Sequence, residues 1–190
     1  MRMLLVAIIA SAVAVLGCGD STSPTGPSGS MFRLMLTDSP FTDAKAVLVT
    51  FSEVTAHRDS ETDFTTVPLS GGAATRTCDL KKLQGPQDVL GVGTLPAGHY
   101  TQVRLVISSA TIYFDSASTG DACATAIAPP SGSSAPLEIP SGEVKLNRQF
   151  EVPTTGTTTM VLDFDGDRSI RQTGSGRYSM TPVIAVMSVR

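Results

Sequence analysis

The sequence has no tryptophan, few aromatic residues and few charges. Aromatics make up 5% of its 190 residues, charged residues make up 16%, and only three residues are cysteines. So few charges, combined with 17 glycines and 12 prolines, exclude a coiled coil, and three cysteines exclude a small disulfide-packed domain. The net charge of −3 offers no basic surface to a nucleic acid, so we expect no nucleic-acid partner. The hydrophobic content of 41% allows one globular domain with a tail.

A short hydrophobic segment, Met3–Leu16, follows Arg2 near the start of the sequence. It is shorter than the roughly 20 residues that a membrane-spanning helix needs, and it fits the core of a signal peptide. The segment ends in Val15-Leu16-Gly17-Cys18, which resembles the lipobox of bacterial lipoproteins. That resemblance implies that diacylglycerol is attached to the Cys18 thiol and that the peptide is cut just before it. Val15 stands where the family usually has leucine, Leu16 is bulky, and an ordinary secretory signal or a short membrane anchor is the alternative.

The segment after Cys18 is rich in serine, glycine and proline, with Asp20 as its only charge before Ser30. Such a composition predicts a flexible spacer. We therefore expect a lipoprotein signal peptide at 1–17, a lipidated cysteine with its tether at 18–30, and a folded domain at 31–190. The predicted location is the bacterial cell envelope, where the lipid holds the protein on the membrane. The predicted side is periplasmic or outer-membrane/surface. Gly19, and not aspartate, follows Cys18, so the inner-membrane retention signal of similar lipoproteins is missing, which favours an outer or surface location.

Cys78 and Cys123 remain once the lipid has taken Cys18. Two spare cysteines in an exported protein usually form a disulfide, so we predict a bridge between them. The alternative is two separate buried thiols. A metal site at these cysteines is not expected, because His57 and His99 lie far away in the sequence and show no ligand spacing.

Apolar residues alternate with polar ones along much of the chain after residue 31. Phe32, Leu34 and Leu36 show this pattern, and so does the segment Tyr100–Ile107. A period of two predicts half-buried strands, and glycine and proline mark the turns between them. Helical periodicity is weak, with at most one short helix within Asp79–Leu90. The sequence therefore predicts an all-β fold, an antiparallel sandwich or barrel with at most one short helix.

Four local expectations follow from the pattern of side chains. The inward-facing parity switches at Ser52-Glu53 within 47–56, which predicts a β-bulge. Residues 110–114 form either a hairpin partner of the preceding strand or its continuation. Leu137–Ile139 lies between two prolines and is expected at a sheet edge. The final segment, Tyr178–Val189, is apolar on both faces after Pro182, which predicts a central strand.

Five phrases together resemble one bacterial family, the domain of unknown function 4382. They occur in the family's order over about residues 31–187: Leu36-Thr37-Asp38-Ser39-Pro40, Val49-Thr50-Phe51-Ser52-Glu53-Val54, Leu95-Pro96-Ala97-Gly98-His99-Tyr100-Thr101-Gln102-Val103-Arg104-Leu105, Leu162-Asp163-Phe164-Asp165-Gly166-Asp167-Arg168-Ser169-Ile170 and Tyr178-Ser179-Met180-Thr181-Pro182-Val183-Ile184. The resemblance implies an exported, often lipid-anchored domain with an antiparallel β-sandwich, a Greek key of the transthyretin or immunoglobulin kind. The family has no established catalytic residues, so none is carried over. Residues 116–134, which include Cys123, depart from its pattern and resemble an insertion.

Asp163, Asp165 and Asp167 are the most suggestive polar group, and they are weak candidates for a calcium site. Calcium takes about six to eight oxygen ligands, more than these three side chains supply. An EF-hand loop is excluded, because Arg168 and Gly174 stand where that loop needs glycine and glutamate. The favoured interpretation is a solvated strand end with an aspartate that caps the following turn. We therefore expect no metal site.

Other polar residues are expected to have structural or solvating roles. Asp38 precedes Ser39-Pro40 and is interpreted as a turn former. The basic residues at 81–82 and 145–148 are interpreted as solvated surface. Gly91-Val92-Gly93 lacks the lysine and the following helix of a phosphate-binding loop, so no cofactor is expected.

No catalytic motif is present either. The sequence has no G-x-S-x-G elbow, and His57 and His99 are its only histidines. A triad assembled from distant residues stays open as an alternative. We therefore expect a non-enzymatic, lipid-anchored β-sandwich that binds an envelope protein or polysaccharide. The alternatives are an envelope hydrolase or metal-dependent enzyme with a spatially assembled site, and a structural module that assembles through its sheet edges. The scarcity of aromatic residues disfavours a glycan relative to a protein partner.

Overall fold

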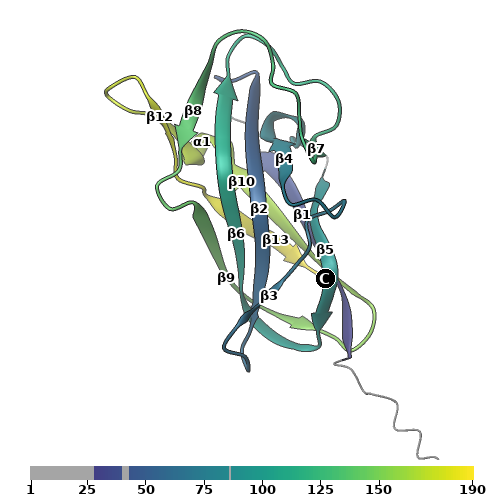
Figure 1. Ribbon diagram of the computed structural model, residues 1–190. Coiled ribbons are helices and arrows are strands. Elements are labelled where there is room, and N and C mark those ends of the chain that lie inside the picture. Colours follow the sequence, from purple (N-terminus) through teal and green to yellow (C-terminus); the bar gives the residue numbers. More distant parts are fainter. Residues whose placement is uncertain (1–27, 40–42, 86) are drawn as a thin grey trace, which may run out of the picture.

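The computed structural model describes residues 28–39, 43–85 and 87–190 (Figure 1). Two β-sheets pack face to face with the hydrophobic core between them, and within these described residues helix is confined to two single turns. The predicted all-β sandwich is therefore confirmed. The predicted segments 1–17 and 18–27 lie outside the described residues. The first strand begins at Gly29, two residues before the position at which we expected the folded domain to start.

The smaller sheet has four strands in the order β13-β10-β1-β5. Its strands are β1 (Gly29–Ser39), β5 (Asp88–Pro96), β10 (Thr157–Asp165) and β13 (Ile184–Val189). β1 and β10 run parallel, whereas β5 and β13 are antiparallel to their neighbours. The sheet is therefore mixed, where the sequence predicted only antiparallel pairing. A parallel pair needs a long crossover, and here most of the larger sheet, with the strands β2 to β4 and β6 to β9, lies in the sequence between β1 and β10.

The larger sheet is built around the long antiparallel pair β2 (Ala46–Arg58) and β6 (Gly98–Tyr113), which lies in front of the smaller sheet in Figure 1. Its strand order is β11-β12-β8-β6-β2-β4-β7, with β3 paired to β2 and β9 paired to β6. The remaining strands are β3 (Phe64–Thr66), β4 (Arg76–Asp79), β7 (Cys123–Ala124), β8 (Ser134–Glu138), β9 (Glu143–Val152), β11 (Ile170–Gln172) and β12 (Tyr178–Met180).

The core contains the inward-facing side chains of both sheets. Phe32 of β1 stacks on Phe150 of β9 with ring centroids 5.6 Å apart, and Tyr100 of β6 stacks on the same ring at 5.2 Å. The buried Tyr100 hydroxyl donates a hydrogen bond to the Pro96 carbonyl oxygen over 2.9 Å. This aromatic stack joins the two sheets near the start of β1, because a buried aromatic contributes both apolar area and ring–ring contact.

The two helical turns are each capped by an aspartate. Asp79 caps the 3₁₀ turn η1 (Leu80–Lys82), and Asp165 caps α1 (Gly166–Ser169). In both, a carboxylate oxygen accepts a backbone N–H of the first turn, which the helix itself leaves without a partner. Within the described residues, no helix is long and apolar enough to cross a membrane.

Several local predictions are confirmed. The register of β2 against β6 shifts around Ser52, which is the expected bulge. Residues 110–113 continue the preceding strand as part of β6. Cys78 of β4 and Cys123 of β7 form the predicted disulfide, and they lie directly opposite each other in the sheet.

Two local predictions are wrong. The segment 178–189 is not one central strand: β12 belongs to the larger sheet, β13 is an edge strand of the smaller one, and the chain crosses between them at 181–183. Pro182 lies at that crossing. β13 is apolar on both faces, but its outer face is exposed and is not covered by another layer as the sequence suggested. β8 is also not at an edge, because it pairs with both β6 and β12.

Candidate binding groove between β9 and β13

The aspartates of the weak calcium prediction lie at the end of β10. Asp163 lies on the strand, Asp165 caps α1 through the Arg168 N–H at 3.0 Å, and Asp167 is exposed in the helical turn. No group of three His, Cys, Asp or Glu side chains in the described part of the chain is placed to hold a metal ion. Capping is the role that the structure gives to Asp165. Cys18 lies outside the described residues.

Asp38 is not in a turn, as the sequence suggested, but lies in β1 and is 6% exposed. The pKa of its carboxyl is raised to about 8, mainly by burial and next by the charge of Asp163, with a smaller contribution from Asp165 and with Lys81 opposing them. The Gly166 N–H also favours the carboxylate. Its Oδ1 has no hydrogen-bond partner among the described residues. Asp38 is therefore held mainly as the neutral acid at pH 7.

The two histidines lie on neighbouring strands of the larger sheet and have separate partners. His57 Nδ1 is 3.0 Å from the Thr101 hydroxyl oxygen, and its ring packs on Phe64 with centroids 4.8 Å apart. His99 Nδ1 is 2.6 Å from Glu151 Oε1 at the surface. In the described part of the chain, neither ring has a hydrogen bond to a serine. These residues therefore show no serine–histidine hydrogen bond of the kind that a triad uses.

The feature most suited to binding is a groove along the open side of the sandwich. It lies between β9, an edge of the larger sheet, and β13, an edge of the smaller sheet, and these two strands contact each other. Among the described strands, each of the two pairs along one side only: β9 with β6, and β13 with β10. At the opposite edge of the smaller sheet, residues 68–70 bond to β5 and cover it. The open side therefore brings together two unpaired strand edges.

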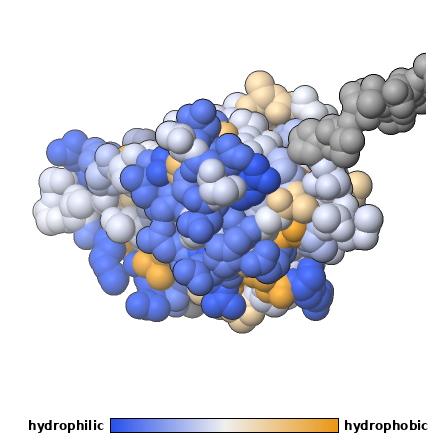
Figure 2. Space-filling view, turned by 90° about the horizontal axis from the view of Figure 1, so that it is seen from below, coloured by the Kyte–Doolittle hydropathy of each residue, from blue (hydrophilic) through white to orange (hydrophobic). Residues whose placement is uncertain are grey.

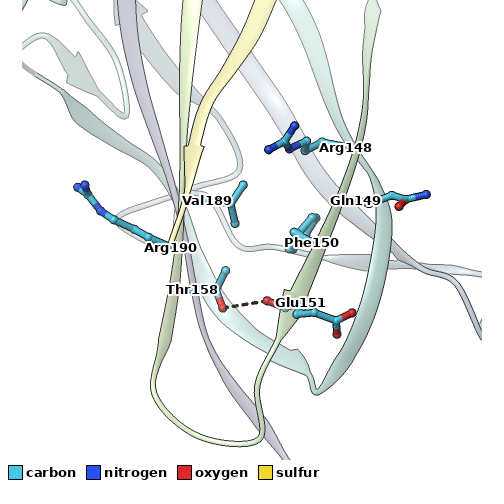
Figure 3. Close-up of a pocket in the computed structure, with 7 residues that line it drawn as sticks. All are labelled: Arg148, Gln149, Phe150, Glu151, Thr158, Val189 and Arg190. Carbon is cyan, nitrogen blue, oxygen red and sulfur yellow. Dashed lines mark hydrogen bonds between the residues drawn. The ribbon is translucent and has the colours of Figure 1, made fainter.

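The groove consists of two adjoining hollows. The first, about 330 Å³ in volume, lies toward the end of β13, and Figure 3 shows the residues around it: Arg148, Gln149, Phe150, Glu151, Thr158, Val189 and Arg190. The second, about 280 Å³, is lined by Lys145, Leu146, Asn147, Arg148, Ile184 and Val186. Both volumes lie near the lower end of the range for small-ligand sites. The first hollow has polar and apolar lining in about equal parts, and the lining of the second is mainly polar.

Arg148 is the one residue that lines both hollows. The inward-facing positions of β9 are Val144, Leu146, Phe150 and Val152, all buried, and Arg148 occupies the same parity between them. Its side chain points across the gap toward β13, whereas Gln149 points away (Figure 3). The Arg148 side chain has no hydrogen-bond or ion-pair partner within residues 28–39, 43–85 and 87–190. Arg148 itself is exposed, and the register of β9 against β6 shifts beside it, between Asn147 and Phe150, so this arginine lies at the exposed rim of the groove with its donors free.

A guanidinium without a protein partner can hold an anionic group. Its fork of N–H donors matches the two oxygens of a carboxylate. The Arg190 side chain turns away from the hollow (Figure 3), and Lys145 lies at the rim within 3.6 Å of Glu143, so Arg148 is the central cation of the groove. The sequence predicted a solvated surface for the basic residues at 145–148, and Lys145 and Arg148 are exposed in the structure. It did not predict that Arg148 lines a groove, although the alternation puts this arginine where its neighbours two residues away are apolar.

Residues 29–182 match the family described as Domain of unknown function (DUF4382). The chain belongs to this family. The match includes β9 with Arg148, and it ends just before β13. No curated protein and no solved structure matches the DUF4382 chain.

Proposed function

We propose that this DUF4382 protein is a non-enzymatic binding module of the bacterial cell envelope, anchored by lipid on Cys18, which holds an anionic extracytoplasmic partner in the β9–β13 groove. The observation that carries the proposal is Arg148, an exposed arginine without a partner in the described structure, which lines both hollows of the groove. The separated histidines support a binding role over catalysis. The acidic chain as a whole does not attract anions, so selectivity would come from this local site.

In the proposed arrangement, the lipid attaches the protein to the membrane and the folded domain does not. β1 begins at the lower end of the molecule in Figure 1, and Figure 2 shows that end from below. The described surface visible there is mainly hydrophilic, with hydrophobic atoms scattered among polar ones. Scattered apolar residues are ordinary for a surface and do not form a membrane-inserting patch. The lipobox-like sequence that ends at Cys18 supports the anchor.

We expect Cys18→Ala to abolish lipid attachment. When cells are fed an alkyne-tagged fatty acid, the wild-type protein should carry the tag and sediment with membranes, because two or more acyl chains anchor stably. The variant should carry no tag. Ser21→Ala is the matched control in the same segment and should be labelled like the wild type. Fatty-acid label retained by the Cys18→Ala protein would refute the anchor.

The groove is tested by binding to two anionic polymers, poly-L-glutamate and polygalacturonate, at low ionic strength. We expect the unlipidated Cys18→Ala chain to bind at least one of them, and Arg148→Glu to weaken that binding by about tenfold or more, because a charge-assisted bond becomes a repulsion. Arg171→Glu is the control: it changes the net charge equally, at an exposed position on β11, and should alter binding by less than about twofold. Binding of neither polymer, or equal losses in both variants, would contradict the proposed site.

A further inference from the structure

The two strands that border the groove differ in how their free edges are protected. β9 carries Lys145, Arg148 and Glu151, and charges on an edge strand hinder pairing with another strand. β13 has no charged residue and no proline from Ile184 to Val189. It is the uncharged, apolar edge of the smaller sheet, because β5 at the other edge is covered by 68–70. An edge of this kind is suited to accept a further strand.

The register of β13 shows which backbone groups face outward. Thr159 and Arg190 exchange both of their backbone hydrogen bonds, at 2.7 and 3.0 Å, and Asp165 donates to Val183 at 2.9 Å. Bonded and non-bonded pairs alternate along an antiparallel ladder, and the register shift between Val161 and Leu162 takes up one extra residue. Ile184 and Val186 are therefore in non-bonded pairs, so their N–H and C=O groups point to the free edge.

The side chains beside that edge separate into two faces. Ile184 and Val186 face the groove, on whose other side Arg148 lies. Ala185 and Met187 face outward from the smaller sheet and are exposed, Met187 by 63%. The inner side chains of a strand added beside β13 would therefore face the Arg148 guanidinium. Its outer side chains would lie beside apolar neighbours.

We propose that the partner is a protein segment with alternating acidic and apolar residues, which extends the smaller sheet by pairing with the free edge of β13. This inference rests on the proposed function and specifies its partner. The acidic side chains lie toward Arg148, and the apolar ones lie beside Ala185 and Met187. Backbone bonds to Ile184 and Val186 supply the remaining contacts.

A polysaccharide fits these residues less well. Sugar rings stack on exposed aromatic faces. Phe150 is the one aromatic residue that lines the groove, and it is 6% exposed because its ring packs against Phe32 and Tyr100. The groove thus offers a cation for acidic side chains and strand edges for a peptide backbone. It does not offer an exposed aromatic surface on which sugar rings could stack.

The test uses the unlipidated full chain and the capped hexapeptide Val-Glu-Val-Glu-Val-Glu, which equals β13 in length. We expect calorimetry to show binding that Arg148→Glu weakens by about tenfold or more and Arg171→Glu by less than about twofold. Two isomeric peptides, N-methylated on all valines or on all glutamates, distinguish pairing from charge alone. Successive N–H groups of a strand point to opposite edges, so one isomer should lose binding and the other should retain it.

The outcomes distinguish failure of strand addition from failure of the proposed function. Equal binding by both methylated isomers, or equal binding by the Arg148→Glu chain, would overturn strand addition. If the hexapeptide does not bind but polygalacturonate binds in an Arg148-dependent way, the proposed function stands and the peptide partner is wrong. If neither polymer nor hexapeptide binds, both the proposed function and this inference fail.

Discussion

Replacing Asp38 with asparagine is expected to stabilise the folded domain at pH 8 and above, and to flatten its stability profile between pH 4 and 8. Burial raises the pKa of Asp38 from 3.8 to about 8, with the charge of Asp163 as the next cause. The folded protein therefore holds the proton more tightly than the unfolded chain does. Asparagine is always neutral and keeps an oxygen that can accept the Gly166 N–H.

The sign of this effect follows from proton binding. Between pH 3.8 and about 8 the folded state binds more protons at Asp38 than the unfolded state, so the free energy of unfolding falls as the pH rises. The contribution is fully present below the unfolded pKa and is lost by pH 8 to 9. A pKa shift of this size corresponds to a loss on the order of 5 kcal/mol, which is a large part of the stability of a typical domain.

Urea unfolding of the unlipidated chain at pH 5, 7 and 9 measures this prediction. The difference in unfolding free energy between Asp38→Asn and the wild type should grow in favour of the variant from pH 5 to pH 9. Asp167→Asn, at the exposed position in α1, is the control and should show no comparable growth. Parallel profiles for wild type and Asp38→Asn would mean that Asp38 is not held neutral.

Removing the Cys78–Cys123 bridge is expected to lower the free energy of unfolding by about 4 kcal/mol. The bridge closes a loop of 45 residues, and the chain-entropy picture gives roughly this value for such a length. The loss is also local. β7 has two residues and pairs with β4, and the disulfide adds a covalent restraint to the hydrogen bonds that hold the segment before it, such as the bond from the Ser118 hydroxyl to Asp79.

The measurement is denaturant unfolding of two proteins that both carry Cys18→Ala. One is the Cys78→Ser, Cys123→Ser double variant, and the other is its parent with the disulfide intact. A thiol reductant should lower the midpoint of the parent and leave that of the double variant unchanged. Hydrogen exchange should increase most at 116–124. Equal midpoints for the two proteins in the absence of reductant would contradict the expected contribution.

The sequence predicted the strands better than their partners. Alternation is local, so 32–36, the bulge at Ser52 and the long strand through Tyr100–Ile107 could be recognised from it. The parallel pairing of β1 with β10 joins residues more than 120 positions apart, and no local pattern encodes it. The position of the final strand was predicted wrongly for a similar reason, because an exposed apolar face and a covered one have the same sequence pattern.

The residues of the candidate site were visible in the sequence, but their neighbours in space were not. Arg148 was visible as a charged residue at inward parity, but its significance depends on β13, which lies across the sandwich and more than 30 residues later. Asp38 looked like a turn former because proline follows two residues on. Its burial depends on packing beside α1 and η1, and those neighbours come from distant parts of the chain.

The claim that binding occurs on the open side of the sandwich is tested most directly by residue-resolved amide hydrogen exchange. The unlipidated chain is compared with and without poly-L-glutamate and with and without polygalacturonate. The account predicts that protection is gained along β13, above all at Ile184 and Val186, and along the Arg148 region of β9. Protection confined to another surface, such as the 116–134 segment, or no protection with either polymer, would contradict it.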